Sequence, residues 1–360
     1  MQDSTGIADE LDLAIVNCLQ INPRASWTQL SRALDVDPVT VARRWNRLSD
    51  SGTAWVTGRA AGHGTPESCL AVIELSCAAS ETLAIANRIA RLPHVLNLEH
   101  TSGPRALTIL VEVRDLAFLS RFLLDSLGSI PGVVSASSHA VTKVLTMGDH
   151  WKLKVIDATQ RAIMARSLPR HLTQLAANRP DGLRPYDDVD KQLILLLGED
   201  GRMPVSTMAG RTGLSESTIR RRLAELVNHG RVVLRCDIAL PASGWPVITW
   251  LWAHVSPDDA ETIRTILHRI EGIRACFQIS GGQPNLLLGL NTRSLREAPV
   301  IEAKLADAAP RLSIIDRSMV LRSIKRMGRE LDEAGRSVAS IPMNIWAAPT
   351  SPPPHRETTT

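Results

Sequence analysis

The chain has 360 residues, of which 44% are hydrophobic and 22% charged, and its formal net charge is +4. This composition is typical of a soluble protein with roughly two to four domains, and no apolar run reaches the length of about eighteen residues that spans a bilayer. The five cysteines form no C-x-x-C pair and follow no signal peptide. We therefore expect a cytoplasmic protein with reduced thiols and without a disulfide scaffold, a metal site or a cofactor.

The second half of the chain repeats the first. Arg24 corresponds to Arg202 at an offset of 178 residues, and the same offset aligns Asp12 with Asp190. Beyond Gly103 the offset becomes 179 and the match continues to the end of the repeat. A repeat of this length indicates a duplicated structural unit, so each element is expected twice.

Each copy begins with three short helical patterns and a short strand. The helices are expected at 9–21, 27–34 and from Pro38 onward in the first copy, and at 189–197, 205–212 and from Glu216 onward in the second. Asp37 and Ser215 precede the third helices and are typical N-cap residues. Pro38 and Glu216 are favourable in a first helical turn. The strands follow at Trp55-Val56 and at Val232-Val233-Leu234.

The third helix of each copy has an apolar face and a basic face. In the first copy Val41, Trp45 and Leu48 recur at helical spacing and should turn inward. The outer faces then hold the candidate DNA contacts, which are Thr40, Arg43, Arg44 and Arg47 in the first copy and Ser217, Thr218, Arg220, Arg221 and Arg222 in the second, with Glu225 in the place of Arg47. A charged helix face is more often simply solvated. Its duplication with the same cap and the same apolar stripe favours a helix that enters the major groove.

The rest of each copy alternates strand and helix patterns in the order β-α-β-β-α-β. The elements are expected at 69–77, 80–92, 94–102, 106–113, 115–128 and 132–145, and again at 246–255, 258–270, 272–280, 285–292, 294–308 and 311–323. This order is typical of a ferredoxin-like sandwich, in which two helices cover one face of an antiparallel sheet. The uncovered face needs a partner because it is apolar, and it is expected to include Val72, Leu110 and Val111 in the first copy and Ile248, Trp250, Trp252 and Leu288 in the second.

These features together resemble the Lrp/AsnC (feast/famine) family of transcription regulators. The family's helix-turn-helix pattern is matched by Asp12, Leu19, Arg24, Leu30, Thr40-Val41, Arg44, Leu48 and Gly52, and again by Asp190, Leu197, Arg202, Leu214-Ser215, Thr218-Ile219, Arg222, Leu226 and Gly230. The resemblance implies an α+β fold in which two winged-type helix-turn-helix domains alternate with two ferredoxin-like effector domains of the RAM/AsnC type. The expected domains are 9–60, 66–146, 187–238 and 245–330, with a helix-containing linker at 147–186 and a disordered tail at 340–360.

The resemblance also implies partners. Double-stranded DNA is the expected partner, and the two unlike recognition helices should read different half-sites. Family members pair their sheets between chains, so here the second copy can supply the partner sheet in an intramolecular pseudo-dimer, which is expected to associate further into a homo-oligomer.

The small-molecule site is where the chain departs from the family. Family effector domains resemble G-x-x-D at the turn between the second and third strands, where the acid helps to hold an amino acid. The corresponding residues are Gly103 and Ala106 in the first copy and Gly281, Gly282 and Asn285 in the second. Because both copies lack the acid, an effector site competes with the interpretation that these turns only join two strands.

Two other functions stay open beside a DNA-binding regulator that is not an enzyme. Some sirohaem decarboxylases are similar to fused Lrp-like double units, and Gln283-Pro284-Asn285-Leu286 faintly resembles their Y-N-L stretch. However, the tyrosine is missing, and their C-Y-x-R element appears only as Ala275-Cys276-Phe277-Gln278. The other alternative is an oligomeric sensor of the same fold that does not touch DNA.

Overall fold

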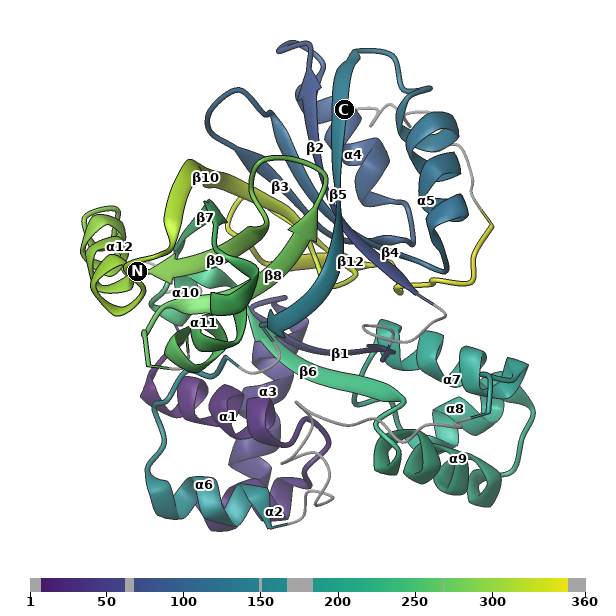
Figure 1. Ribbon diagram of the computed structural model, residues 1–360. Helices are drawn as coiled ribbons and strands as arrows, with labels where there is room; N and C mark the ends of the chain where they lie inside the picture. Colours follow the sequence, from purple (N-terminus) through teal and green to yellow (C-terminus); the bar gives the residue numbers. More distant parts are fainter. Residues whose placement is uncertain (1–7, 62–67, 149–150, 167–183, 268, 349–360) are drawn as a thin grey trace. The chain divides into compact units, whose positions relative to one another are not determined.

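The computed structural model describes residues 8–61, 68–148, 151–166, 184–267 and 269–348 (Figure 1). The chain forms two compact units. The helical unit contains Met1–Ala61, Lys152–Ser243 and Arg336–Asn344, and the sheet unit contains Gly62–Trp151, Gly244–Gly335 and Ile345–Thr360. Each unit therefore combines the corresponding parts of both copies.

The helical unit holds two three-helix domains. Its elements are α1 (Glu10–Ile21), α2 (Trp27–Leu34), α3 (Pro38–Asp50) and β1 (Ala54–Ala60) from the first copy, and α7 (Asp188–Glu199), α8 (Val205–Thr212), α9 (Glu216–Asn228), β6 (Val232–Ile238) and the short α10 (Leu240–Ser243) from the second. The helices begin where the sequence predicted. Asp37 and Ser215 are the N-caps of α3 and α9, and their side chains accept hydrogen bonds from first-turn backbone amides.

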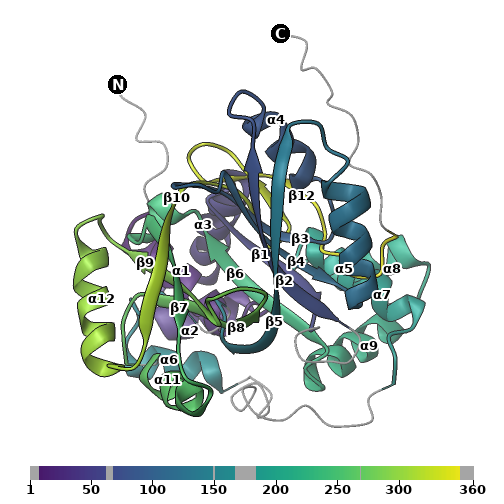
Figure 2. The same ribbon diagram turned by 45° about the horizontal axis from the view of Figure 1, so that its top comes forward.

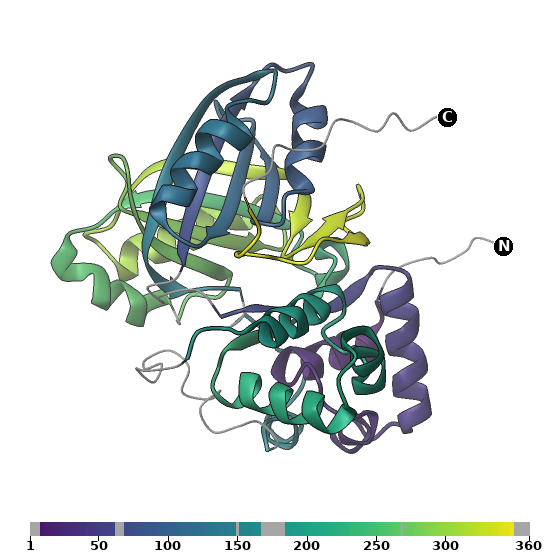
Figure 3. The same ribbon diagram turned by 90° about the vertical axis from the view of Figure 1, so that its right-hand side faces the viewer.

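The two three-helix domains are held to each other, and Figure 3 shows the purple helices of the first copy beside the teal and green helices of the second. Strands β1 and β6 pair in antiparallel register from Ala54↔Ile238 to Ala60↔Val232. In addition, Arg24 donates to the carbonyl of Gly201 at 2.7 Å, and Arg202 donates to the carbonyl of Pro23 at 2.7 Å. These two arginines occupy equivalent positions, so the contact is reciprocal.

Two further segments complete the helical unit. Helix α6 (Ala158–Ala165) packs against α2, and Gln29 Nε2 lies 3.4 Å from the carbonyl oxygens of Ile163 and Met164. Near the carboxyl end, β12 (Ser337–Ser340) contacts both copies, because Ser337 N donates to Gly52 O at 2.8 Å and Ser340 Oγ to Gly198 O at 3.2 Å.

The expected disordered tail at 340–360 needs correction. Residues 340–348 are described, and within them Met343 and Ile345 are buried. Pro342 lies directly against Gly198, where a Cβ would come within 3.0 Å of its side chain. Apolar burial outweighs the flexibility that the proline-rich composition suggested. Residues 349–360 lie outside the described part of the chain.

The sheet unit contains two β-α-β-β-α-β domains. The first has β2 (Cys69–Cys77), α4 (Thr82–Ala90), β3 (Val95–Thr101), β4 (Leu107–Val113), α5 (Leu116–Arg121) extended by a π-helical turn (Phe122–Leu127), and β5 (Val133–Thr146). The second has β7 (Val247–His254), a 3₁₀ turn (Pro257–Asp259) leading into α11 (Ala260–Leu267), β8 (Ile273–Ser280), β9 (Leu286–Thr292), α12 (Glu297–Ala308) and β10 (Ser313–Arg326), followed by the short β11 (Arg329–Leu331). The order agrees with the sequence prediction in both copies.

The eight long strands of the sheet unit form a closed ring, called here the strand ring. The hydrogen-bonded order is β10-β3-β4-β2-β5-β8-β9-β7, and β7 pairs again with β10. Both seams between the copies are made by the last strand of one copy and the second strand of the other. Val141 on β5 pairs with Ile279 on β8, and Val320 on β10 pairs with Thr101 on β3. The second copy therefore supplies the partner sheet from within the same polypeptide.

Each sheet has one face toward its helices and one face toward the ring interior, because side chains alternate along a strand. In the first copy α4 and α5 lie on one side of the strands (Figure 2). Ala71, Ile73 and Leu75 belong to the core that these helices cover, whereas Val72 lies on the opposite face. Two residues expected on the uncovered face are placed otherwise. Val111 belongs to the helix-covered core of the first copy, as does Leu288 to that of the second. In these all-buried strands, hydropathy alone does not distinguish the two faces.

Candidate nucleic-acid interface

The two recognition helices, α3 and α9, are anchored by their apolar stripes. Val41, Trp45 and Leu48 of α3 are buried, and so are the equivalent residues of α9, Ile219, Leu223 and Leu226. The caps fix where the helices begin. Asp37 Oδ1 accepts from Val39 N at 2.8 Å, and Ser215 Oγ accepts from Thr218 N at 3.2 Å. The first turns therefore have a defined direction, and the opposite helix faces are turned outward.

The outer face of α3 is open. Val39 is 74% exposed, Arg43 is exposed, and Thr40 is half-buried beside them. Within the described part of the chain, Arg43 makes no ion pair. Its guanidinium can therefore reach a phosphate or a base edge without breaking an existing contact.

The outer face of α9 carries two arginines that are already paired. Arg220 bonds Glu216 at 2.8 Å, and Arg221 bonds Glu225 at 2.8 Å, each across one helical turn. Both arginine side chains are more than half exposed. Such surface pairs contribute only about 0.3–0.5 kcal/mol, so a phosphate can displace the carboxylate. Ser217, which corresponds to Val39, is also exposed.

Arg44 and Arg222 were predicted to face solvent, and the structure gives them a different position. Arg44 donates to Asp12 at 3.0 Å and to Asp9 at 2.5 Å. Arg222 lies 3.0 Å from Asp187 and 3.5 Å from Asp190. Asp12 and Asp190 are only 1% and 0% exposed, and a buried carboxylate requires a charged partner. These arginines thus fasten the recognition helix to the start of α1 or α7.

The interaction with Arg44 also changes the ionisation of Asp9, the N-cap residue of α1. The hydrogen bond from Arg44 lowers the pKa of Asp9, with a further contribution from the backbone amide of Asp12. Asp9 is the N-cap of α1, and its side chain accepts from Asp12 N while Asp12 bonds back to Asp9 N. An ionised Asp9 therefore holds both the helix cap and Arg44.

The difference between Arg47 and Glu225 follows from how each buried aspartate is neutralised. In the first copy, Arg47 is the second arginine bound to Asp12. In the second copy, Asp190 is bound by Arg184 at 2.8 Å and by Arg231 at 3.2 Å, neither of which lies on α9. Position 225 is therefore free to be an acid, and Glu225 pairs with Arg221.

Arg184 and Arg231 were not among the residues predicted from the sequence. Arg184 lies six residues before Asp190, whereas Arg231 lies 41 residues after it. The signal for Arg231 was a charged residue directly before the strand β6: Arg231 is 7% exposed and stacks on Tyr186, with its Cζ 4.3 Å from the ring centroid. Such a residue needs a carboxylate nearby.

The candidate effector turns are occupied by structural contacts. Gly103 and Gly281 have φ of 92° and 114°, which favours glycine. A Cβ on Gly281 would lie 2.7 Å from Ser138 O. The side chain of Asn285 bonds both backbone groups of Val255, accepting from N at 3.0 Å and donating to O at 2.7 Å.

The other two candidate effector residues, Ala106 and Gly282, have no polar side chain that could bind an amino acid. Ala106 joins the turn through backbone hydrogen bonds to Leu75 and Thr101. Gly282 is exposed and has no side chain to offer. The described turns therefore present no carboxylate to an amino acid, and the amide of Asn285 is already bonded.

Two kinds of feature are absent from the described residues. No group of three or more His, Cys, Asp or Glu side chains could hold a metal ion. Among the helices in the described ranges, none is long and apolar enough to cross a membrane.

Comparison with known proteins identifies the family. Residues 9–49 and 187–227 match the AsnC-type helix-turn-helix domain, and residues 70–149 match the Lrp/AsnC ligand binding domain. A Pyrococcus abyssi protein described as an uncharacterised HTH-type transcriptional regulator is 31% identical over 145 residues, which cover 39% of this chain and 89% of the relative. The chain belongs to the Lrp/AsnC family. A similar Pyrococcus horikoshii regulator is 30% identical over 145 residues, with the same coverage of 39% and 89%.

The Lrp/AsnC unit occurs twice in this chain, and a solved structure shares the doubled arrangement. The siroheme decarboxylase NirDL, in complex with an iron-uroporphyrin III analogue, aligns with a TM-score of 0.56 and 14% identity. The alignment covers 89% of this chain and 93% of NirDL. At this identity the similarity shows a common fold.

Proposed function

We propose that the protein is a sequence-specific, DNA-binding regulator of transcription. The observation that carries this proposal is the pair of capped, outward-facing basic helices within one compact helical unit. A recognition helix that is fixed by its cap and its apolar stripe can present side chains to the major groove in a defined register. Two such helices held by β1–β6 pairing and by the Arg24 and Arg202 contacts can engage two half-sites together. The Pyrococcus relatives described as HTH-type transcriptional regulators support this function.

The two helices are proposed to read different half-sites. Arg43 is unpaired within the described residues, whereas its counterpart Arg221 is held by Glu225. Thr40 is flanked by Val39, while Thr218 is flanked by Ser217 and by Arg220. One helix offers an apolar contact where the other offers a hydroxyl and a cation, so the preferred bases should differ. We expect a target that is not a strict palindrome.

The test separates arginines that contact DNA from those that support the fold. A genomic DNA-binding selection with the full chain gives the target, and binding is then measured at several salt concentrations. Arg43→Ala and Arg221→Ala should each weaken binding by about 1–3 kcal/mol if they read a base, or lower the salt slope by about one if they contact phosphate. Arg44→Ala should instead lower the thermal stability, because it removes a partner of buried Asp12.

Arg296→Ala is the matched control, because Arg296 is an exposed arginine on the sheet unit. It should change neither binding nor stability. Unaltered DNA binding by both Arg43→Ala and Arg221→Ala, or no selected DNA at all, would contradict the proposal and favour a sensor that does not touch DNA.

The fold shared with NirDL makes sirohaem chemistry the second candidate function. The segments compared with those enzymes offer no reactive group in the described structure. Cys276 and Phe277 are 0% and 1% exposed, and the amide of Asn285 is bound to Val255. We therefore infer a regulator that is not an enzyme. A Soret band that stays with the chain after unbound sirohaem has been removed would favour the enzyme instead.

A further inference from the structure

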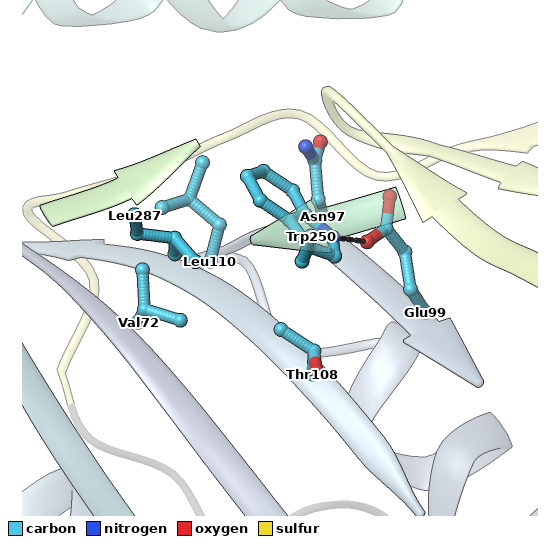
Figure 4. Close-up of a pocket in the computed structure, with 7 residues that line it drawn as sticks. All are labelled: Val72, Asn97, Glu99, Thr108, Leu110, Trp250 and Leu287. Atoms are coloured by element: carbon cyan, nitrogen blue, oxygen red, sulfur yellow. Dashed lines mark hydrogen bonds between the residues drawn. The ribbon is translucent and has the colours of Figure 1, made fainter. Parts of the chain in front are cut away.

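The interior of the strand ring is filled by unlike side chains from the two copies. The equivalent positions, first copy then second, are Val72 and Trp250, Glu74 and Trp252, Asn97 and Ala275, Glu99 and Phe277, Thr108 and Leu287, Leu110 and Gly289, and His139 and Ser318. Figure 4 shows residues of both copies that point toward one another in this interior, and the cavity between them is about 10 Å³. A cavity of this size holds at most one water, so the residues that line it pack closely against each other.

A hydrogen bond from Trp250 to Glu99 joins the two copies in this interior. Trp250 Nε1 donates to Glu99 Oε2 at 2.6 Å, and the two residues are 8% and 4% exposed. Burial raises the pKa of Glu99, and the bond from Trp250 partly offsets this effect. The equivalent place on the other side of the ring is occupied by Phe277 and Val72, which are both apolar.

The indole of Trp250 has room only because the residue opposite it on β9 is Gly289. Trp250 and Gly289 are register partners on β7 and β9, and a Cβ on Gly289 would lie 2.8 Å from the Trp250 ring. In the first copy, the register partner of Val72 is Leu110. A large residue is thus opposed to glycine in one sheet, and two mid-sized residues are opposed in the other.

A second group of contacts joins the copies near the turns. Arg105 of the first copy bonds its own Glu74 at 2.5 Å and Asp316 of the second copy at 2.5 Å. The Cζ of Arg105 lies 5.3 Å from the ring centroid of Trp252, and the His139 ring lies 4.9 Å from the same indole. The positively charged group and the imidazole come from the first copy, and the indole on which they pack comes from the second.

We propose that the ring interior selects the pairing of unlike halves, so that a first-copy sheet accepts a second-copy sheet and rejects another first-copy sheet. In a ring of two first copies, Glu99 would meet Val72 in the place of Trp250. A buried acceptor without its donor costs about 1–3 kcal/mol, and a ring contains two such places.

Other pairings of like halves fail for related reasons. In a ring of two first copies, Arg105 would meet Ser137 in the place of Asp316, and a second Glu74 would stand in the place of Trp252. Two buried carboxylates in one cluster repel each other. In a ring of two second copies, Trp250 would meet Phe277 in the place of Glu99, which leaves its N–H without an acceptor. The selection therefore uses repulsive as well as attractive contacts.

The first experiment is a double-mutant cycle in the full chain, measured by urea unfolding. Glu99→Leu and Trp250→Phe each replace one partner of the hydrogen bond by an apolar side chain. Each should lower the folding equilibrium constant by about tenfold. The loss in the double variant should be clearly smaller than the sum of the two single losses, because neither partner is then left unpaired. Additive losses in the double variant would overturn the proposal. Glu99→Gln keeps an acceptor and is the matched control that should stay near the unmodified chain.

The second experiment measures which halves pair with each other. Chains carrying Thr101→Cys, Val141→Cys and Ile279→Cys, half of them ¹⁵N-labelled, are refolded together at high concentration and treated with a short bis-maleimide. Links between differently labelled chains are identified by peptide mass spectrometry. Val141 faces Ile279 when unlike halves pair, and by symmetry it would face Thr101 when two first copies pair.

Because only links between chains are compared, the tether within a chain does not bias the result. We expect links between 141 and 279 to exceed those between 141 and 101 by about tenfold or more, since one lost buried bond corresponds to about that factor. The excess should shrink in the Glu99→Leu, Trp250→Phe background. Comparable amounts of both links in the unmodified background would overturn the proposal.

Discussion

Lys325 on β10 provides a sharp test of the packing in the sheet unit. The side chain is fully buried, and its Nζ donates to Leu92 O at 2.9 Å. Burial lowers the pKa of Lys325 to about 7, against an opposing effect of Glu330. A lysine in this setting is neutral in the folded chain at a pH where it is charged in the unfolded chain.

The sign of the pH dependence follows from proton counting. Between pH 7 and about 10.5 the unfolded chain holds a proton on Lys325 that the folded chain has released. The free energy of unfolding therefore rises with pH in this window, and at lower pH Lys325 adds no pH dependence because it is protonated in both states. From pH 7 to pH 8.5 the increase is about 1.5 kcal/mol, because the full slope is about 1.4 kcal/mol per pH unit and is reached only above the folded pKa.

Lys325→Met removes the titrating group and keeps the length of the side chain. The assay is urea unfolding of the unmodified chain and of the variant at pH 7, 7.5, 8 and 8.5. Lys325 itself contributes to lowering the pKa of His94, but burial is the larger cause, so His94 stays neutral in both proteins over this range. The unfolding free energy of the unmodified chain minus that of Lys325→Met should rise by about 1.5 kcal/mol across this range, because only the unmodified chain gains stability as Lys325 loses its charge. A difference that stays constant would show that Lys325 is not buried as described.

Two further predictions concern contacts between and within the copies. Arg202→Ala removes two hydrogen bonds to backbone carbonyls of the first copy and a guanidinium 4.0 Å from the Trp27 ring centroid. It should lower stability by about 2–4 kcal/mol in thermal unfolding, far more than Arg211→Ala on the surface of α8. Asn285→Asp restores the acid of the family pattern but loses the donor to Val255 O, so we expect a loss of about 1–3 kcal/mol, whereas Gln283→Glu in the same turn should be neutral. A stable Asn285→Asp variant whose melting temperature rises with added amino acids would instead support the effector interpretation.

The sequence predicted the elements well because their signals are local. Caps such as Asp37 and Ser215 and the apolar stripes of α3 and α9 depend on residues within a few positions of each other. The order of strands and helices was predicted correctly for the same reason. The two faces of the strands were predicted less well. Leu110 and Val111 are adjacent, so alternation puts one on each face, but their similar hydropathy does not show which of them faces the helices, and the same holds for Leu288.

The candidate DNA contacts show the limit of local reasoning more clearly. The helical wheel places Arg43 and Arg44 on the same basic face. Only the approach of α1, which brings Asp12 to 3.0 Å from Arg44, separates an exposed arginine from a structural one. The second copy also contains both an exposed and a structural arginine, because it too has a buried aspartate and an outward-facing side of the recognition helix. A matched pair of residues in a repeat can therefore be retained for folding as well as for binding.

The duplication also explains why the two copies can diverge without loss of the fold. A chain that pairs with an identical chain must make each interface position compatible with its own copy, because a two-fold interface meets itself. Once both halves lie in one polypeptide, position 99 can be an acid while its counterpart is Phe277, provided that Trp250 supplies the donor. The same freedom applies at position 225, where Arg184 and Arg231 replace the arginine that the first copy takes from its recognition helix. Divergence in the ring interior fixes which halves pair, and divergence on α3 and α9 then gives that pair two different surfaces for DNA.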